Sequence, residues 1–144
     1  MSVGTVARFT FTHPVEVRFR DCDPMGHVNH AVYFSYLEVA RFAYWRKLME
    51  TRPGPDASII MAHAECDYRA SAETGDVLDV RMGLAGMGRS SLTYDYEIVD
   101  RTKKLVVATA RVILVAYDYT AGKPIPIPDE MRERLEIFER ESIA

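Results

Sequence analysis

The chain has 144 residues, which is enough for one ordinary hydrophobic core and too few for two, so we expect a single domain over residues 1–144. Hydrophobic residues make up 48% of the sequence and charged residues 27%, a composition typical of globular proteins. The net charge of -3 and the scattered basic residues argue against nucleic acid as a partner, and no apolar run approaches the roughly 18 residues of a membrane span.

The N-terminus and the cysteines bear on the compartment. Residues 1–12 lack the basic, apolar and small-residue segments of a signal peptide. Cys22 and Cys66 form no CxxC pair and are too few for a disulfide framework. We therefore expect a cytoplasmic protein without a thiolate zinc site.

The first two predicted elements are a strand and a long helix. Residues 15–19 alternate with a period of two, which predicts a strand with Val15, Val17 and Phe19 on its buried face. Residues 31–50 contain no Gly or Pro and predict a helix. Its apolar stripe recurs every three or four residues at Tyr33, Leu37, Ala40, Tyr44 and Leu48. Further apolar residues lie outside that stripe, as expected if a curved sheet wraps the helix, namely Phe34, Val39, Phe42 and Trp45.

Four more strands are predicted over residues 60–70, 78–82, 92–98 and 105–117. The strand over 60–70 alternates between a solvent-exposed and a buried face. The strand over 105–117 is apolar at nearly every residue and is expected to be covered on both faces. Short linkers at 86–89 and 100–103 favour antiparallel hairpins. The Pro-rich segment 123–128 cannot donate a regular ladder, and a charged surface helix is predicted over 129–141. The fold class is therefore α+β with a mainly antiparallel sheet.

Residues 20–33 form the most informative segment, between the first strand and the helix. Their sequence is Arg-Asp-Cys-Asp-Pro-Met-Gly-His-Val-Asn-His-Ala-Val-Tyr, with two carboxylates and two imidazoles. This run places acid/base groups beside the unpaired N–H groups of a helix N-terminus. Acyl transfer needs both, an activated oxygen and donors for the oxyanion that forms. The segment therefore reads as a reaction site.

The order of elements resembles the hot-dog fold, in which a mainly antiparallel five-stranded sheet wraps a long central helix. The run Asp-Cys-Asp-Pro-x-Gly-His-Val-Asn-x-x-x-Tyr resembles the signature of the 4-hydroxybenzoyl-CoA thioesterase-like acyl-CoA thioesterases. Tyr68, the run Thr-Gly-Asp at 74–76 and the run Gly-Arg-Ser-Ser-Leu-Thr at 88–93 resemble that family at the corresponding places. The resemblance implies an enzyme that hydrolyses an acyl-CoA thioester to the free acid and coenzyme A. No cofactor is implied, because coenzyme A is part of the substrate.

The resemblance also implies roles for individual residues. In this family the second Asp of Asp-x-Asp is the nucleophile or general base, and an N–H at the start of the helix polarises the thioester carbonyl. By position these groups are Asp23 and the main-chain amide of His30. The His30 side chain is expected to be incidental, because the proposed donor is its main-chain N–H. The family commonly carries Asn at this place, and the alternative is that the imidazole reshapes the acyl pocket or tunes the reaction pH. Asp23 has a plainer interpretation, an Asx turn before Pro24.

Other residues of the segment have supporting roles. His27 is a candidate to orient the carboxylate or the water, or to protonate the departing thiolate. Asn29 is a candidate helix cap, and Gly26 permits a positive φ or close approach of substrate. Tyr33 is expected to line an acyl tunnel or simply to join the core.

Two structural roles and one further binding role complete the assignments. We expect Asp21 to be a structural hydrogen-bond acceptor. Glu38 and Arg41 are expected to form an ion pair on the helix, the alternative being that Glu38 faces the pocket. A separate turn contains the substrate-binding candidates Arg89, Ser90 and Ser91, which would receive the pantetheine or phosphates of coenzyme A, the alternative being a solvated hairpin.

Competing functions remain open at this stage. A metal hydrolase would have to draw all its ligands from one turn, so we expect no metal. An enoyl-thioester hydratase of the same fold and an acyl-thioester binding module without turnover are the alternatives. The expected partner is an acyl-CoA molecule, with an acyl group that the sequence leaves undefined. A sheet of this kind leaves its edge strands open, so a homodimer or homotetramer with sites at the subunit boundary is expected.

Overall fold

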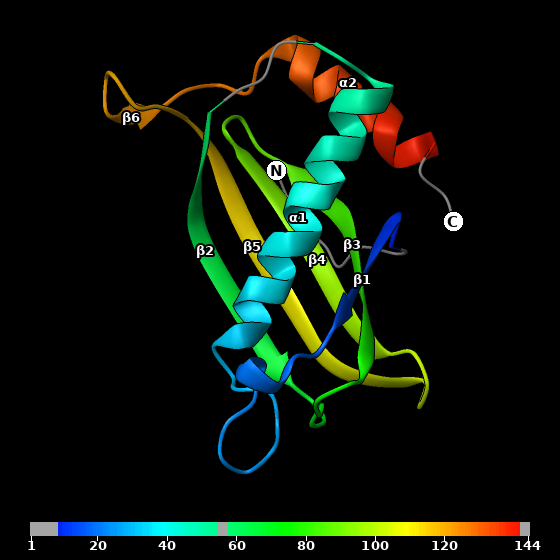
Figure 1. Ribbon diagram of the computed structural model, residues 1–144. Coiled ribbons are helices and arrows are strands. Elements are labelled where there is room, and N and C mark those ends of the chain that lie inside the picture. The colour runs from blue at the N-terminus through cyan, green and yellow to red at the C-terminus, as the bar shows by residue number, and fades with distance from the viewer. Residues whose placement is uncertain (1–8, 55–57, 142–144) are drawn as a thin grey trace.

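The computed structural model describes residues 9–54 and 58–141. Its elements in chain order are β1 (Phe11–Glu16), a 3-10 turn (Phe19–Asp21), α1 (Val32–Thr51), β2 (Ile59–Tyr68), β3 (Val77–Met87), β4 (Ser91–Asp100), β5 (Leu105–Asp118), β6 (Lys123–Pro124) and α2 (Asp129–Glu141). The main sheet has the order β1-β3-β4-β5-β2 with antiparallel neighbours throughout, and β6 pairs with β5. Figure 1 shows α1 lying across one face of this sheet. The predicted long helix, hairpins and antiparallel sheet are all present.

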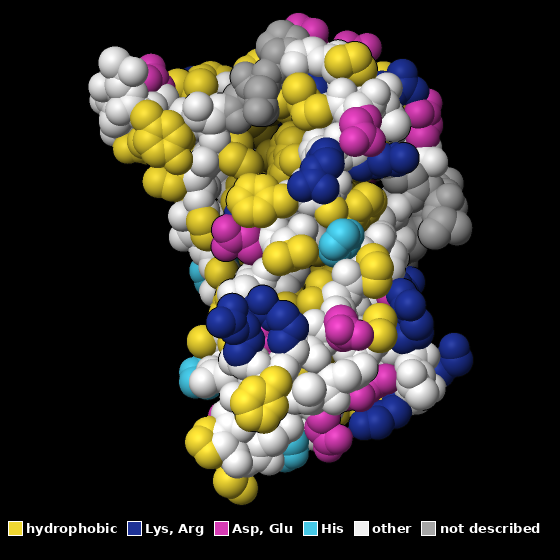
Figure 2. All heavy atoms as spheres, viewed as in Figure 1, with side chains coloured by type: hydrophobic (Ala, Val, Ile, Leu, Met, Phe, Trp, Pro, Cys, Tyr) yellow, Lys and Arg dark blue, Asp and Glu magenta, His cyan; other side chains and the backbone are white. Residues whose placement is uncertain are grey.

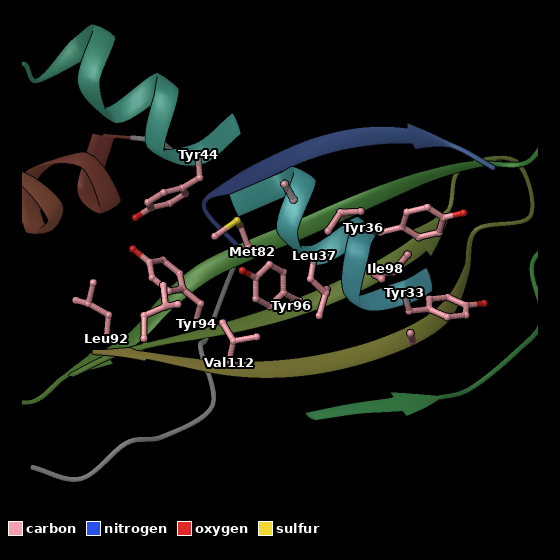
Figure 3. Packing of buried hydrophobic residues seen from close by; sticks show 14 of the residues in the cluster. Tyr33, Tyr36, Leu37, Tyr44, Met82, Leu92, Tyr94, Tyr96, Ile98 and Val112 are labelled. Carbon is pink, nitrogen blue, oxygen red and sulfur yellow. The ribbon is translucent and has the colours of Figure 1, made fainter. Parts of the chain in front are cut away.

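The core lies between α1 and the central strands. The whole predicted stripe of α1 is buried, and Tyr36 joins it. The residues that face it from the sheet include Met82, Tyr94, Tyr96, Ile98 and Val112 (Figure 3). Each large apolar side chain buried here contributes about 1.5–3 kcal/mol to folding before entropy costs are counted. The stripe therefore fixes which face of α1 meets the sheet, and with it the direction of the helix N-terminus.

Helix α2 fixes the other end of α1. Glu139 of α2 accepts hydrogen bonds from the hydroxyl of Tyr44 at 2.5 Å, the main-chain N–H of Leu84 at 3.1 Å and the hydroxyl of Thr10 at 3.0 Å. The pairing of β3 with β4 shifts register between Leu84 and Gly86, and Leu84 N–H bonds Glu139 at this irregularity. One carboxylate thus ties together α1, α2 and β3.

The first strand lies earlier in the chain than predicted. Strand β1 ends at Glu16, after which the N–H of Val17 bonds to the oxygen of Asp76 and the chain enters the 3-10 turn. Phe19 is 85% exposed, so its predicted place on the buried face is wrong. Alternation continued through Phe19 in the sequence, but hydrogen bonds to Asp21 turn the chain away from the sheet first.

Strand β2 is exposed on both faces, whereas the sequence predicted one dry face. Eight of its ten residues are exposed, because α1 packs over β3, β4 and β5 instead. The outward side of α1 is apolar as well, with Phe34, Val39 and Phe42 exposed. Strand β5 also differs from the prediction, since one face is buried and the other only half-buried. Strand β2 and the outward side of α1 therefore both expose apolar side chains to solvent in the single chain.

Candidate active site

The loop between the 3-10 turn and α1 is held by main-chain hydrogen bonds. The N–H of Asp23 bonds to the oxygen of His27 at 2.8 Å, and the N–H of Gly26 bonds back to the oxygen of Asp23 at 2.9 Å. Gly26 has a φ of 85°, and a side chain there would meet no atom within 4 Å, so the backbone conformation and not lack of space requires glycine. The N–H of Val28 bonds to Ala72, which ties the loop to the segment after β2.

The carboxylate of Asp23 forms the Asx turn through one of its two oxygens. Its Oδ1 atom accepts hydrogen bonds from the N–H groups of Met25 at 2.9 Å and His27 at 3.4 Å, which is an Asx turn. Its Oδ2 atom makes no hydrogen bond with the part of the chain that the structure describes. One oxygen therefore holds the loop while the other is unoccupied by protein donors.

The buried carboxylate of Asp21 holds the start of the loop that contains Asp23. This carboxylate accepts hydrogen bonds from the N–H of Arg18 at 2.9 Å, from the Arg18 guanidinium at 2.9 Å and from the Tyr36 hydroxyl at 2.8 Å. Burial by itself would raise the pKa of Asp21, but the hydrogen bonds from Arg18 and Tyr36 together outweigh it and lower that pKa. The structural role expected for Asp21 is the one the structure has.

At the helix start the main-chain N–H of His30 is free within the described residues. Asn29 accepts the N–H of Ala31 on its side-chain oxygen and the N–H of Val32 on its main-chain oxygen, both at 2.9 Å. The N–H of His30 bonds to no acceptor within residues 9–54 and 58–141. It stands where the helix dipole is positive. The predicted hydrogen bond to the Asn29 side chain is present, but the N-cap of α1 is Ala31, which makes no side-chain capping bond, and the N–H of His30 is an unused donor.

These groups meet in a cleft of about 390 Å³. Its lining residues are Asp23, His27, Val28, His30, Tyr33, Tyr68, Arg69, Ala70 and Ser71. Four residues singled out from the sequence thus line one cleft, whereas Gly26 and Asn29 shape its loop from outside. The sequence did not predict that residues 68–71, at and after the end of β2, line the same cleft. The one signal for this in the sequence was Tyr68, which resembled the family but received no role.

Burial removes two other groups from acid/base chemistry. It raises the pKa of Tyr33 to about 12, so this phenol stays protonated at neutral pH. Burial likewise raises the pKa of the Cys66 thiol. Neither side chain offers an anionic nucleophile near pH 7. Asp23 is the one carboxylate among the residues that line the cleft.

Three predicted substrate contacts lie elsewhere in the chain. Arg89 and Ser90 belong to the β3–β4 turn and Ser91 begins β4, at the opposite end of the sheet from the loop of Asp23 (Figure 1). Strand β3 spans the distance between them, roughly 35 Å at about 3.3 Å per residue. One chain does not bring these residues to the cleft.

Two further expectations concern ions. The predicted ion pair of Glu38 with Arg41 is not among the salt bridges of the described residues, and the Arg41 guanidinium lies over the ring of Phe42 instead.

Within the same residues, no group of three or more His, Cys, Asp or Glu side chains is placed to hold a metal ion. None of the helices there is long and apolar enough to span a membrane.

Comparison with known proteins identifies the family. Residues 17–135 match the profile of the Thioesterase-like superfamily. The chain belongs to this superfamily. The match covers the loop of Asp23, the central helix and all strands of the main sheet except β1.

Solved and curated members of the superfamily agree with this assignment. A thioesterase from Thermus thermophilus, solved in complex with coenzyme A and Zn, is 34% identical with a TM-score of 0.79, over 94% of this chain and 99% of that one. The acyl-CoA thioesterase YbgC of Haemophilus influenzae is 28% identical over 85% of this chain and 91% of its own. A 1,4-dihydroxy-2-naphthoyl-CoA hydrolase of Synechococcus elongatus is 29% identical over 84% and 91%. The predicted hot-dog fold and the resemblance to acyl-CoA thioesterases are confirmed.

Proposed function

We propose that this thioesterase hydrolyses an acyl-CoA thioester with Asp23 as general base or nucleophile and the main-chain N–H of His30 as the donor to the carbonyl oxygen. One observation carries the proposal. The unoccupied Oδ2 atom of Asp23 and the unused N–H of His30 belong to residues that line the same cleft. An activated oxygen and an oxyanion donor are the two things that acyl transfer requires.

The reaction then proceeds in the usual order for acyl transfer. Either Asp23 takes a proton from a water that attacks the carbonyl carbon, or its carboxylate attacks directly and water later cleaves the mixed anhydride. The N–H of His30 stabilises the negative oxygen in both routes. The C–S bond breaks, and the thiolate of coenzyme A leaves and takes up a proton. His27 can supply that proton, although a thiolate is a good enough leaving group without it.

Isotope labelling distinguishes the general-base route from the nucleophilic route. A single turnover in ¹⁸O-labelled water places the label in the acid product when Asp23 activates the water, whereas water that cleaves a mixed anhydride at its aspartyl carbonyl places the label in Asp23 and leaves the acid product unlabelled. Repeated turnover places the label in the carboxylate of Asp23 only when this residue forms the anhydride. Mass spectrometry of the peptide that contains Asp23 therefore distinguishes nucleophile from base.

Dimerisation through β2 would complete the substrate site. Strand β2 has a free edge and carries exposed apolar residues, including Ile60 and Met61. Two copies of β2 related by a two-fold axis pair antiparallel, so the start of one strand lies beside the end of the other. The start of β2 is near Ser90, because Ile59 pairs with Ala116 and the N–H of Ala116 bonds to the oxygen of Ser90 at 2.8 Å.

The same pairing assigns a place to the remaining predicted contacts. The end of β2 carries Tyr68, which lines the cleft of Asp23. In the dimer this cleft faces the β3–β4 turn of the partner subunit, with Arg89 of the partner subunit as the cation for the phosphates of coenzyme A. We propose a homodimer, alone or paired as a homotetramer, that works in the cytoplasm without a cofactor.

A panel of acyl-CoA substrates tests the proposed activity. The purified chain is expected to release free thiol from at least one saturated or aromatic acyl-CoA, measured with a thiol reagent. Incubation with crotonyl-CoA serves as the comparison, because a hydratase would add water to the double bond without releasing thiol. Binding of acyl-CoA with neither reaction would identify a binding module and contradict the proposal.

A further inference from the structure

Tyr68 links the end of β2 to the start of the central helix. Its hydroxyl donates a hydrogen bond to the main-chain oxygen of His30 at 2.9 Å. Its ring meets the ring of Tyr33 edge-on with centroids 5.3 Å apart, and meets the imidazole of His30 at 6.4 Å. Tyr68 thus contacts two other residues that line the cleft of Asp23.

The bond from Tyr68 completes the fixing of the peptide groups around His30. The peptide group of residues 30 and 31 is held at both ends, since Tyr68 binds its oxygen and Asn29 Oδ1 binds its N–H, the N–H of Ala31. The preceding peptide group is held through the oxygen of Asn29, which accepts the N–H of Val32 at 2.9 Å. Among the N–H and C=O groups of these two peptide units, only the N–H of His30 makes no hydrogen bond within the described residues. Its direction is therefore set by neighbours that are each tied down.

Elsewhere β2 stands away from α1. A cavity of about 370 Å³ lies between them near Leu37 and Ala64, and another of about 440 Å³ lies near Phe42 and Met61. Figure 2 shows a hollow lined by hydrophobic side chains toward the upper half of this face. Packing therefore does little to fix β2 against the helix along most of its length. The hydrogen bond and ring contacts of Tyr68 do so at the end where the cleft lies.

We propose that Tyr68 is a positioning residue for thioester hydrolysis, whose hydroxyl holds the peptide group of residues 30 and 31 so that the His30 N–H is aimed before substrate binds. The inference rests on the proposed function, because it concerns the same donor. A donor fixed in advance needs no reorganisation during the reaction, which is the source of its catalytic effect. Loss of the hydroxyl leaves the donor present but free to turn.

The chain offers a matched control for this hydroxyl. Tyr119 is 62% exposed and donates to the oxygen of Ile59 at 3.0 Å, at the other end of β2. Tyr68 is 46% exposed and makes the same kind of bond. The variants Tyr68→Phe and Tyr119→Phe each remove one phenolic oxygen that donates to a main-chain oxygen. They differ in whether that main-chain oxygen belongs to His30.

Steady-state kinetics with the best acyl-CoA of the panel tests the inference. Removal of an oxyanion donor costs a factor of about 100 to 1,000 in kcat, so loosening one is expected to cost at least about tenfold. We expect this loss in kcat for Tyr68→Phe with KM within about twofold, and no change in either constant for Tyr119→Phe. The melting temperatures of the two variants should agree with each other.

Three results would overturn the role of Tyr68 while the enzyme itself remains a thioesterase. They are an unchanged kcat in Tyr68→Phe, an equal loss in Tyr119→Phe, and a loss that falls on KM alone. A wild-type chain that releases thiol from no acyl-CoA would overturn the proposed function, and this inference with it.

Discussion

The hydroxyl of Tyr36 donates a 2.8 Å hydrogen bond to the Oδ2 atom of Asp21, and this contact joins the central helix to the loop that precedes it. Both residues are buried. Replacement of Tyr36 by Phe leaves the carboxylate without one of its donors, which costs about 1–3 kcal/mol for a buried charged acceptor. Urea unfolding of Tyr36→Phe should show a loss of this size. Tyr119→Phe, which removes an exposed hydroxyl, should lose far less.

The lowered pKa of Asp21 predicts how stability changes with pH. In the unfolded chain this carboxyl titrates near its ordinary value of about 3.9, and in the folded chain it titrates lower. Its contribution is therefore fully present above the unfolded pKa and is lost as the pH falls through the folded pKa. The stability difference between the wild type and Asp21→Asn should shrink as the pH is lowered from about 6 to about 3. A difference that grows on acidification would contradict this sign.

The exposed edge of β2 predicts an effect of one charge on assembly. Met61 is 42% exposed on β2, and Leu105 is 44% exposed at the start of β5. Aspartate at position 61 would be buried in the proposed dimer without a partner, which costs several kcal/mol. We expect Met61→Asp to be monomeric in light scattering with weak activity, and Leu105→Asp to be unaffected. A dimer that persists in Met61→Asp would place the interface elsewhere.

His27 lines the cleft, and we predict a smaller part for it than for Asp23. A thiolate leaves readily, so protonation by a general acid helps little compared with activation of the attacking oxygen. His27→Ala should lower kcat by about tenfold or less. The loss in kcat should be smaller for thioesters whose thiol is a better leaving group than that of coenzyme A. A loss as large as that of an Asp23 variant would make His27 the principal base.

Periodicity predicted what depends on local sequence. The buried stripe from Tyr33 to Leu48, the hairpin turns and helix α2 follow from spacing and turn residues alone. The run around Asp23 also predicted the polar turn at the helix start, since a strand and a helix must be joined there. The hydrogen bond that Asn29 accepts from Ala31 likewise joins residues only two positions apart.

Contacts between distant residues could not be read in this way. Phe19 continues the alternation of a strand, but Asp21 draws the chain into a turn through bonds to Arg18 and Tyr36. The exposure of β2 depends on where α1 packs, which no pattern within β2 records. The bond from Tyr68 to His30 joins residues 38 positions apart. Such contacts follow from the assembled fold.

The two oxygens of Asp23 predict different outcomes for two substitutions. Asn at this position keeps an oxygen that can accept the N–H groups of Met25 and His27, whereas Ala removes it. Asp23→Ala should therefore lose both activity and about 1 kcal/mol of stability, and Asp23→Asn should lose activity alone. Thermal unfolding of the two variants measures this difference. Equal destabilisation by both would mean that the Asx turn does not hold the loop.

The most direct test of the catalytic assignment is the kcat of Asp23→Asn for acyl-CoA hydrolysis, measured by thiol release beside the wild type. Only the negative charge is removed, so folding and KM should stay close to the wild type. We predict that kcat falls by about three orders of magnitude or more. A variant that keeps a kcat within about tenfold of the wild type would show that Asp23 is not the residue that activates the attacking oxygen.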